Sequence, residues 1–529
     1  MPVPLRERMH WVDVESEKLV SFSKKHVIAT GITPSGDIHV GNMREILTGE
    51  VITRGLKEKG LDAQLIYIGD TIDPLRKVYP FLDDSYKEHV GKPLNEIPCP
   101  CGNHNSYAEH FLNPFLESTR TLGLEAKVLL THEMYAKGMY AEASKKILDN
   151  AEKIGTILEE VSKRDLPEDW FPYNPKCGEC GKITTAKITG YEFPYVIYQC
   201  SCGHEGKADL RKDDGKLPWR VDWPARWWFL GVTFEPFGKD HAAAGGSYDT
   251  AKRISEEIFD MSAPHHVVYE WIQLKGKGAM SSSTGVVVSA VSMLRMTPPE
   301  VFRFFVLRNN PNKHLDFDPG FGILNLVDEY DTTERRYFEG SENDKSKRIE
   351  KIEEDLARTY ELSQPFSIPS KLPLQVPYRH LVSVVQIKED FSGILDILKR
   401  TEHFETLKKE DEKHLRQRVE CVKFWLENFA PEKVKFSIAE KKPILKLMPE
   451  QKKFLEELSL KLSQEEWTAE TIHNAVYELA ESQNLKSKTA FQVVYQAILN
   501  QNFGPRLGYF LSTLDKDFVV RRIGEVAEG

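Results

Sequence analysis

The feature that most constrains this chain is an apolar, β-rich run that leads through a Gly/Pro loop into a helix and then into a second β-rich run. Residues 26–30 (HVIAT) predict a strand, a helical pattern begins at about Asn42, and residues 63–70 (AQLIYIGD) predict the next strand. A strand, a crossover helix and a second strand form the repeating unit of parallel α/β sheets. We therefore expect the chain to open with a nucleotide-binding α/β domain.

The segments that follow extend this sheet and then interrupt it. Residues 126–131 (AKVLLT) predict a third strand, and residues 265–274 (HHVVYEWIQL) predict a return to the α/β pattern. Between them, the region up to about residue 210 carries paired cysteines and is interpreted as an insertion that folds around metal. Beyond about residue 295 the pattern is helical, so we expect an α/β domain followed by an all-α C-terminal domain.

Two segments of the C-terminal half predict helices, at residues 345–363 and 468–483. In the second segment the apolar positions recur at i, i+3, i+4 and i+7, and these positions are Ile472, Ala475, Val476 and Leu479. The charged run at 344–355 is interpreted as a solvated helix face near a domain boundary.

Composition argues against two classes of protein. The sequence contains no run of about 18 apolar residues, which a membrane-spanning helix would need. The start MPVPLRERMHWVDVESEK lacks the apolar stretch of a signal peptide. We therefore expect a cytoplasmic protein without a membrane partner. The net charge of -9 argues against a surface that is basic throughout, although a local basic surface is compatible with an acidic total.

The loop after the first predicted strand has features of a phosphate-binding turn. Residues 31–42 read GITPSGDIHVGN and run into the predicted helix, whose N-terminus offers free N–H groups and a positive dipole end. Glycine lets a nucleotide approach the backbone, and His39 can donate a hydrogen bond to a phosphate oxygen. By itself this motif is weak, because any loop between a strand and a helix tends to contain Gly, Pro and Asn.

Six of the seven cysteines lie between Cys99 and Cys202, and the seventh, Cys421, is expected in the core. The downstream cluster has two knuckles about twenty residues apart, with glycines for the tight turns, which is typical of a zinc ribbon. Its expected ligands are Cys177, Cys180, Cys200 and Cys202. Free thiols are the alternative to a metal site, and His204 is the alternative to Cys202 as fourth ligand.

The upstream cluster offers two thiols and two imidazoles within twelve residues, at Cys99, Cys101, His104 and His110. This spacing is less standard, and the alternative is a histidine satisfied in a polar core beside unrelated thiols. Neither cluster requires an open coordination position. We therefore expect structural Zn²⁺ in the downstream cluster, with the upstream cluster as a second candidate, and no catalytic part for either.

The glycine-rich loop resembles the HIGH signature of class I aminoacyl-tRNA synthetases, whose second signature, KMSKS, is expected on a loop after the last strand of the nucleotide fold. Residues 275–284 (KGKGAMSSST) match that second signature at Met280, Ser281 and Ser283. Ala279 and Ser282 occupy its two lysine positions. In the family, a lysine of this loop neutralises the triphosphate in the transition state. Here we expect that charge to come from Lys277, with Lys275 or a partial loss of the charge as the alternatives.

A longer stretch is similar to the class I lysyl-tRNA synthetases in particular. Residues 220–250 (RVDWPARWWFLGVTFEPFGKDHAAAGGSYDT) carry the closest resemblance, together with SYAEHF at 106–111 and GFGILNLVDEYD at 320–331. Weaker similarity is found in FSIAEKKP at 436–443 and in the GPRLGYFLSTLDKDFV end. The resemblance also implies a metal site in the upstream Cys/His cluster.

The resemblance implies roles for individual residues. The lysine pocket would be lined by Gly31, Thr33, Trp219, Asp240, His241 and Tyr269. The ATP-binding residues would be Pro34, Ser35, Gly36, His39, Gly41 and Asn42. The catalytic residues would be His39, Asn42, Lys277, Met280, Ser281 and Ser283. An aromatic wall suits the methylene stem of lysine and a carboxylate suits its ammonium, but the sequence does not identify that carboxylate.

Two further groups have open interpretations. Asp73, Arg76 and Lys77 resemble a family segment near the acceptor end of tRNA, although helix capping explains an Asp-Pro pair equally well. For at least two members of a tryptophan cluster we expect simple core packing. The cluster consists of Trp219, Trp223, Trp227 and Trp228.

The function implied by the resemblance is activation of L-lysine with ATP to lysyl-adenylate, followed by transfer of lysine to the 3′ end of tRNA(Lys). Mg²⁺ would accompany ATP without a dedicated protein cage. The all-α domain would read the anticodon through splayed bases stacked on side chains. Nothing in the sequence demands more than a monomer.

Three alternatives differ from this prediction. A synthetase for another amino acid would share the ATP machinery, and a tRNA-binding regulator without activation would explain the missing lysines of the second signature. A zinc-ribbon nucleic-acid module would leave the α/β frame unused. The expected divisions are 1–95, first half of a Rossmann-type catalytic domain; 96–212, zinc-binding insertion with part of the catalytic domain; 213–295, second half of the catalytic domain with the KMSKS-like loop; 296–345, connecting helical domain; and 346–529, α-helical anticodon-binding domain.

Overall fold

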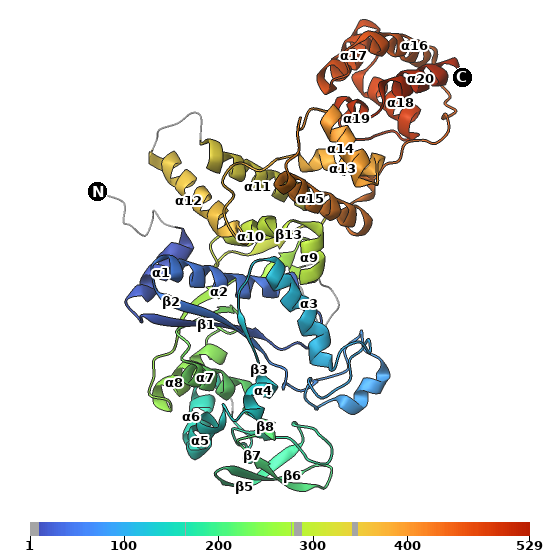
Figure 1. Cartoon of the computed structure of the whole chain (residues 1–529). Coiled ribbons are helices and arrows are strands. Elements are labelled where there is room, and N and C mark those ends of the chain that lie inside the picture. The colour runs from blue at the N-terminus through green and yellow to red at the C-terminus, as the bar shows by residue number, and fades with distance from the viewer. Residues whose placement is uncertain (1–9, 164, 277, 280–287, 341–346) are drawn as a thin grey trace. The chain divides into compact units, whose positions relative to one another are not determined.

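The chain is seen in a computed structural model that describes residues 10–163, 165–276, 278–279, 288–340 and 347–529. The described residues form two compact units (Figure 1). The first unit takes its residues from Met1–Leu294, Pro299–Phe317 and Ser341–Ile368. The second takes its residues from Arg295–Pro298, Asp318–Gly340 and Pro369–Gly529.

A five-stranded sheet in the order β10-β9-β1-β2-β3 forms the centre of the first unit. Its strands are β1 (Lys25–Ile32), β2 (Asp62–Gly69), β3 (Lys127–Leu130), β9 (Phe234–Gly238) and β10 (His265–Tyr269). Every neighbouring pair of these strands is parallel, and β1 and β2 pair in register from Lys25 with Asp62 to Ile32 with Gly69. The predicted parallel α/β fold is therefore confirmed.

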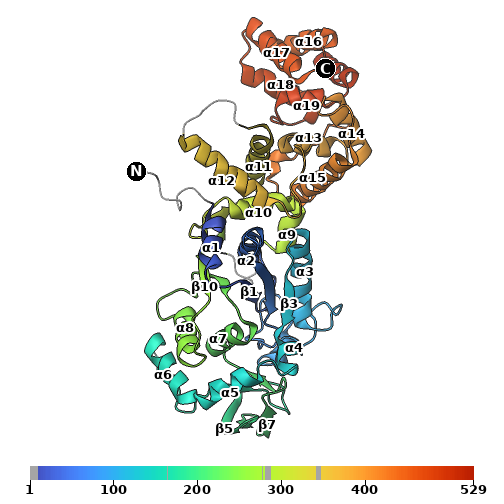
Figure 2. The same cartoon turned by 60° about the vertical axis from the view of Figure 1, so that its left-hand side comes forward.

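Both faces of this sheet are covered, which explains why its strands read as apolar runs without polar alternation. On one face, the α2 helix (Val40–Glu58) brings Gly49 against Ile28 and Leu65. On the other face, Ala29 and Ile66 pack in one cluster with tryptophans of α7 (Trp219–Leu230). The α8 helix (Ser247–Glu257) follows on the same side as α7 (Figure 2).

The predicted insertion contains helices and small sheets. The helices are α3 (Tyr107–Thr121), α4 (Thr131–Ala136), α5 (Ala141–Asp149) and α6 (Ala151–Ser162), with the 3-10 turn η2 (Asp84–His89) before them. The strands are β4 (Asn174–Pro175), β5 (Ala186–Glu192), β6 (Tyr195–Cys200), β7 (Glu205–Asp209) and β8 (Gly215–Lys216). β5, β6 and β7 form an antiparallel sheet, and β4 pairs with β8.

The segment 265–274, for which the sequence predicts a return to the α/β pattern, consists of two strands that belong to different sheets. The chain leaves the central sheet after β10, because the backbone of Glu270 bonds to the Arg44 side chain and to the carbonyl of Pro311. The next strand, β11 (Ile272–Leu274), belongs to another sheet with β12 (Gly278–Ala279) and β13 (Leu315–Phe317). β13 also shows that the region beyond residue 295 is not helical throughout.

The remaining helices of the first unit are α1 (Trp11–Val20), α10 (Pro299–Leu307) and α12 (Lys347–Ser363), and α9 (Ala290–Met296) ends in the second unit. The second unit contains α11 (Gly322–Glu339), α13 (Tyr378–Ile387), α14 (Phe391–Arg400), α15 (Lys409–Asn428), η4 (Glu432–Val434), α16 (Pro449–Gln464), α17 (Ala469–Ser482), α18 (Ser487–Leu499), α19 (Leu507–Ser512) and α20 (Lys516–Glu528). Helices α12 and α17 confirm the two helical predictions.

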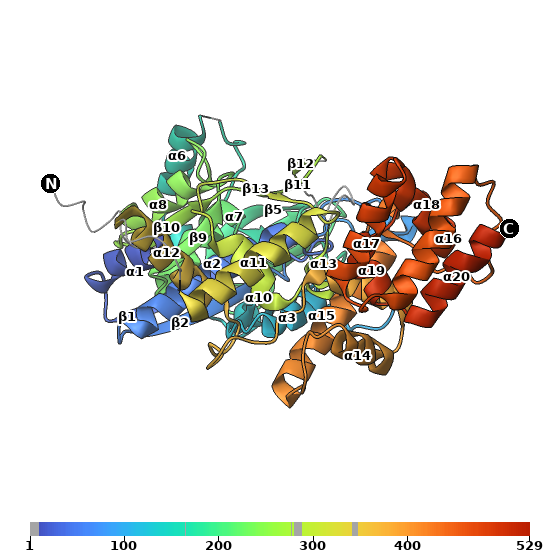
Figure 3. The ribbon, with the colours of Figure 1, turned by 90° about the horizontal axis from the view of Figure 1, so that it is seen from above.

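Helices α16 to α20 of the second unit share an apolar core of their own. Figure 3 shows these helices grouped near the C-terminus. Ile472, Ala475 and Val476 are buried in this core, as their helical spacing predicts, and Leu479 packs against it. Cys421 of α15 is also buried, in agreement with the sequence. None of the described helices is long and apolar enough to cross a membrane.

Candidate active site

A cavity of about 650 Å³ opens at the carboxyl ends of β1 and β9. The order of the strands reverses between these two neighbours, because β2 and β3 follow on one side of β1 and β10 lies on the other side. Ligands of open parallel sheets bind in the crevice at such a reversal. The residues 30–33 at the end of β1 and 235–238 of β9 line this cavity from its two sides.

At the start of α2, the side chains of His39 and Asn42 form a reciprocal cap. His39 Nδ1 accepts a hydrogen bond from the Gly41 N–H at 3.1 Å, and Asn42 Oδ1 accepts from the His39 N–H at 3.2 Å. Burial lowers the pKa of His39 to about 4, so the imidazole is neutral near pH 7. Because Nδ1 accepts, the proton lies on Nε2, which is left as a donor.

Gly41 is required by this arrangement. A Cβ at Gly41 would lie 2.8 Å from both Nδ1 and Cε1 of the His39 ring, closer than side-chain atoms approach one another. A larger residue would therefore displace the imidazole.

A second set of contacts holds the loop that follows β1. The Thr33 hydroxyl donates to Asp73 Oδ2 at 2.6 Å, and the ammonium of Lys216 in β8 pairs with the other oxygen of Asp73. Burial alone would raise the pKa of Asp73, but Lys216 and Thr33 together lower it, so this carboxyl is ionised. Asp73 thus connects the loop to β8, a short strand that follows the predicted insertion, and among the described residues it has no helix-capping contact.

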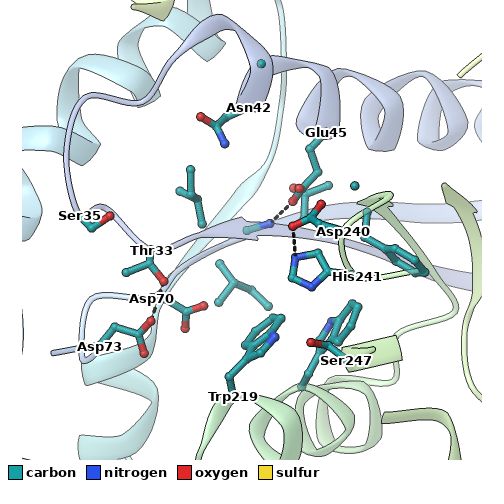
Figure 4. A pocket seen from close by; sticks show the side chains of 18 of the residues that line it. Thr33, Ser35, Asn42, Glu45, Asp70, Asp73, Trp219, Asp240, His241 and Ser247 are labelled. Carbon is teal, nitrogen blue, oxygen red and sulfur yellow. Dashed lines mark hydrogen bonds and ion pairs between the residues drawn. The ribbon is translucent and has the colours of Figure 1, made fainter. Parts of the chain in front are cut away.

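Glu45 is a functional candidate that the sequence did not identify. It lies on α2 three residues after Asn42, and it accepts hydrogen bonds from the Gly31 N–H at 2.9 Å and the Tyr269 hydroxyl at 2.6 Å. Its side chain is half-buried because it lines the cavity, yet the surrounding protein raises its pKa to about 8. Figure 4 shows Glu45 beside Asp240 and His241, with Asp73 and Thr33 across the cavity.

The carboxylates that line the cavity differ in their partners. Asp70 pairs with Arg226, Asp73 pairs with Lys216, and Asp240 is 56% exposed and lies 3.6 Å from His241 Nε2. Glu45 and Glu235 accept hydrogen bonds from neutral donors, Glu235 from the indole N–H of Trp227. Burial raises the pKa of Glu235 to about 7. Burial lowers the pKa of His241, so its imidazole is neutral near pH 7. Among the described residues, Glu45, Glu235 and the exposed Asp240 are thus the cavity acids with no cation bonded to them.

The members of the tryptophan cluster differ in position, because some lie in the hydrophobic core and one lies at the cavity. Trp223 and Trp227 are 2% and 1% exposed and belong to the core, as expected for at least two of the four. Trp219 is half-buried at the cavity and stacks on Trp223 with ring centroids 5.0 Å apart. Trp228 packs against Phe259. The structure therefore offers Trp219 as an aromatic wall.

The structure brings most of the predicted site residues to this one cavity. Those that line it are Gly31, Thr33, Ser35, His39, Gly41, Asn42, Trp219, Asp240, His241 and Tyr269. Pro34 and Gly36 are buried in the same loop and do not line it. Arg76 lines the cavity, whereas Lys77 does not. Lys277, Met280, Ser281 and Ser283 lie outside the described residues.

Each predicted metal cluster is brought together in space. In the downstream cluster, Cys177 Sγ lies 3.7 Å from Cys202 Sγ, and Cys180 Sγ lies 3.7 Å from Cys200 Sγ. Four thiolates bound tetrahedrally to zinc at about 2.3 Å would have sulfurs about 3.8 Å apart, so these four residues fit that ion. His204 is not a member of the cluster.

The upstream cluster is similarly compact. Cys99 Sγ lies 3.3 Å from Cys101 Sγ and 3.3 Å from His104 Nδ1, and Cys101 Sγ lies 3.2 Å from His110 Nδ1. The four ligand atoms lie within 4.8 Å of one another, and two thiolates with two imidazoles are a zinc-binding set. Both clusters can hold a metal ion.

Comparison with known proteins agrees with this geometry. A family model described as tRNA synthetases class I (K) matches residues 9–365, and an anticodon binding domain model matches residues 399–527. The chain is 47% identical to lysine–tRNA ligase 1 of Methanosarcina acetivorans over 98% of both chains. It is 42% identical to the lysine–tRNA ligase of Picrophilus torridus, over 98% of this chain and 99% of the relative.

Among solved structures, it is similar to a glutamate tRNA ligase from Elizabethkingia meningosepticum, with 13% identity, a TM-score of 0.45 and coverage of 95% of this chain and 99% of that one. The class I synthetase model covers more than half of the chain, and the identity to lysine–tRNA ligases extends over almost all of it. The chain therefore belongs to the class I lysine–tRNA ligase family of aminoacyl-tRNA synthetases.

Proposed function

We propose that this chain attaches L-lysine to the 3′ end of tRNA(Lys) at the expense of ATP, and that the cavity between β1 and β9 is where lysine is activated. The observation that carries this proposal is Glu45, a cavity carboxyl group with no cation bonded to it among the described residues. A bound lysine would supply the missing cation through its ε-ammonium.

Lysine would lie with its ammonium at Glu45 and Tyr269 and its methylene stem along Trp219. An ammonium that donates to an enclosed carboxylate makes a charge-assisted hydrogen bond, which is stronger than bonds between neutral groups. The α-carboxylate would then extend toward Thr33 and His241, where it meets ATP. Amino acids without a cation at the end of the side chain would leave Glu45 unpaired, which gives the site its selectivity.

ATP would lie over the start of α2. The Nε2–H of His39 and the free N–H groups of the helix would donate to phosphate oxygens as negative charge builds up on them. Mg²⁺ bound with ATP would neutralise phosphate charge, held by the phosphates and water. We propose Lys277 as the cation that replaces the missing lysines of the second signature.

The reaction has two steps. In the first, a carboxylate oxygen of lysine attacks the α-phosphorus of ATP, the bond to the β-phosphate breaks, and lysyl-adenylate and pyrophosphate form. In the second, the oxygen of a hydroxyl group on the terminal adenosine of tRNA attacks the lysyl carbonyl carbon. The hydroxyl group loses its proton, the bond from the lysyl carbon to AMP breaks, and AMP leaves. The described residues position the reactants and stabilise charge, which are the main sources of catalysis in such a reaction.

Four further points are proposed with this function. Both Cys/His clusters would hold structural Zn²⁺, and the protein would work as a monomer in the cytoplasm. The chain would divide into a catalytic domain at 1–295 with its insertion at 96–212, a connecting domain at 296–345 and an anticodon-binding domain at 346–529. The match of the anticodon domain model to residues 399–527 supports the last of these.

The test is ATP–pyrophosphate exchange with each of the twenty amino acids, with and without tRNA, on zinc-replete protein. Exchange with lysine alone is the expected result. Exchange with another amino acid would mean a synthetase of different specificity. Absence of exchange under every condition, from folded protein that still binds tRNA, would replace the proposal by a tRNA-binding regulator.

A pair of matched variants tests the carboxyl group. In Glu45→Gln we expect the KM for lysine to rise about thirtyfold or more, because truncating a charge pair of this kind costs about 2 to 5 kcal/mol. Glu235→Gln, the same change at another cavity glutamate without a bonded cation, should affect the KM far less. If Glu235→Gln causes the larger rise, the ammonium binds at Glu235.

A further inference from the structure

Arg44 is a buried arginine that stands directly before Glu45 on α2 and is only 1% exposed. Its guanidinium group donates hydrogen bonds to the carbonyl oxygens of Glu270, Pro311 and Lys313, and the last two bonds are 3.0 Å long. Burial lowers the pKa of Arg44 to about 10, so the side chain remains charged near pH 7. A charged fork of donors that satisfies three backbone acceptors joins the segments that carry them.

The two segments that Arg44 joins directly precede β11 and β13. The N–H of Glu270 also donates to the Pro311 carbonyl at 2.9 Å, and the N–H of Leu315 donates to the carbonyl of Trp271 at 3.2 Å. From there β11 and β13 pair in parallel. Arg44 therefore lies at the turn where the chain passes from the central sheet into the small sheet.

This turn separates two parts of the cavity lining. Tyr269 precedes the turn, where it pairs with Gly238 of β9 and its hydroxyl donates to Glu45 at 2.6 Å. Trp271 and Ile272 follow the turn, and both line the cavity. β11 lies against α2, over whose first turn we propose that ATP binds. Residues before the turn thus belong to the lysine side of the cavity, and residues after it lie close to the proposed position of ATP.

The chain that follows the second signature is attached to the start of α2 without help from Arg44. The Val40 N–H donates to the Val288 carbonyl at 3.0 Å, and the Ala290 N–H donates to the Ile38 carbonyl at 3.1 Å. Loss of the Arg44 bonds would therefore release the segment before β11 and leave this second attachment in place.

We infer that Arg44 is a positioning residue for ATP, because its bonds fix the turn after β10 and thereby hold Trp271 and Ile272 against the cavity. Arg44 itself contacts no substrate in this role. The role rests on the proposed function, since it requires that ATP is a substrate of the cavity. A general distortion of α2 would disturb Glu45 as well, whereas a shift of the turn alone acts on ATP and spares lysine.

A second buried arginine offers a matched control. Arg303 of α10 is 0% exposed, pairs with Glu50 of α2 at 2.7 Å, and donates to the carbonyl oxygens of Leu122 and Leu362. None of these four residues lines the cavity. Arg303→Lys therefore weakens the same kind of contact between α2 and neighbouring chain, but outside the candidate site.

The first test measures lysine-dependent pyrophosphate exchange by the two variants of the full-length protein. A lysine side chain has one nitrogen in place of the arginine fork, so in Arg44→Lys the three carbonyl oxygens lose their common partner. We expect kcat/KM for ATP to fall about ten- to a hundredfold, since displacement of a binding group by about 1 Å has effects of this size. The KM for lysine should stay close to the wild-type value, because Glu45 and Tyr269 remain in place.

Arg303→Lys should lower the melting temperature without changing the kinetic constants for either substrate. Equal values of kcat/KM for ATP in the two variants would overturn the role of Arg44. A rise of the KM for lysine in Arg44→Lys that equals the rise for ATP would also overturn it, because both changes would then follow from a general distortion of α2.

Hydrogen exchange tests the turn in the wild-type protein, without dependence on how well a variant folds. ATP at a concentration that saturates pyrophosphate exchange should slow the exchange of the backbone amides of residues 270–274, and lysine alone should not. In Arg44→Lys the same amides should exchange faster than in the wild type when no ligand is present. Unchanged exchange of residues 270–274 on addition of ATP would overturn the inference.

The wild-type protein separates failure of this inference from failure of the proposed function. Wild-type protein that activates lysine, while Arg44→Lys and Arg303→Lys have the same kinetic constants, would refute the role of Arg44 alone. Wild-type protein that shows no pyrophosphate exchange with any amino acid would refute the proposed function, and with it the role that rests on it.

Discussion

At the scale of single residues, an ionised Glu45 lowers the stability of the folded chain until a cation binds. Its pKa is about 8 in the folded chain against 4.5 as the ordinary value, so the folded state retains a proton that the unfolded state has released. The contribution of Glu45 to stability is therefore present below pH 4.5 and is lost as the pH rises toward 8. At pH 7 the loss is on the order of 3 kcal/mol.

Glu45→Gln should remove this dependence, because the amide stays neutral at every pH. We expect the variant to melt at a higher temperature than the wild type without lysine, by a margin that grows from pH 5.5 to pH 8. Thermal unfolding over that range measures the margin, and saturating lysine should stabilise only the wild type. A margin that does not change with pH would show that Glu45 is ionised in the free protein.

Gly41 provides a second prediction at this scale, since a methyl group there collides with the His39 ring. We expect Gly41→Ala to slow lysine-dependent pyrophosphate exchange about a hundredfold, the effect of losing one well-placed donor. Stability should change little, because alanine favours a helix over glycine. The control is Gly155→Ala in α6, where the nearest atom would be 3.6 Å away and exchange should be unaffected. Equal exchange rates in the two variants would contradict the role of His39.

At the scale of elements, the two clusters of metal-binding side chains can each hold a metal ion. We expect about two zinc ions per chain, and Cys200→Ser should reduce the content by one and expose β5, β6 and β7 to proteolysis. Cys421→Ser, which alters a buried cysteine outside both clusters, should leave the zinc content unchanged. Metal analysis after dialysis measures the zinc content of both variants. A Cys200→Ser protein that keeps the full zinc content would contradict the predicted zinc ribbon.

The sequence predicts elements well where local pattern decides them. The strands at 26–30 and 63–70 are apolar because both faces of the sheet are covered, and α17 has a regular apolar stripe. β9 was not predicted, because Phe-Glu-Pro-Phe-Gly contains a glutamate and a proline, and its place in the sheet depends on tertiary contacts. The sequence pattern also did not predict the division of 265–274 into two strands, because the break depends on Arg44, a residue distant in sequence.

The candidate site shows the same limit. His39 and Asn42 could be found because they belong to a local motif, and the cysteines because metal ligands cluster along the chain. Glu45 stands one helical turn after Asn42, which places both on one face of α2, but that face is known to line a cavity only once β9 and Tyr269 are in position.

At the scale of the whole molecule, charge is distributed unevenly. The chain is acidic overall, whereas the lining of a cavity of about 710 Å³ in the C-terminal unit has four basic side chains, Arg379, Lys433, Lys435 and Arg506, against one acidic side chain, Asp328. Net charge alone is therefore no guide to a local basic surface, because a local concentration of cations is lost in a sum over 529 residues. The two units also have separate apolar cores, which a pattern along the chain does show, as a change from α/β to helical periodicity.

The neighbours of β1 have a consequence for synthesis on the ribosome. β2 emerges soon after β1 and covers one edge, but the strand that covers the other edge begins only at Phe234, roughly two hundred residues later. At translation rates of about 5 to 20 residues per second, that edge of β1 stays without its partner strand β9 for about 10 to 40 s. The nascent chain thus presents an apolar, unpaired strand edge while the insertion is being made, and this edge is its main opportunity for chaperone binding or misassembly.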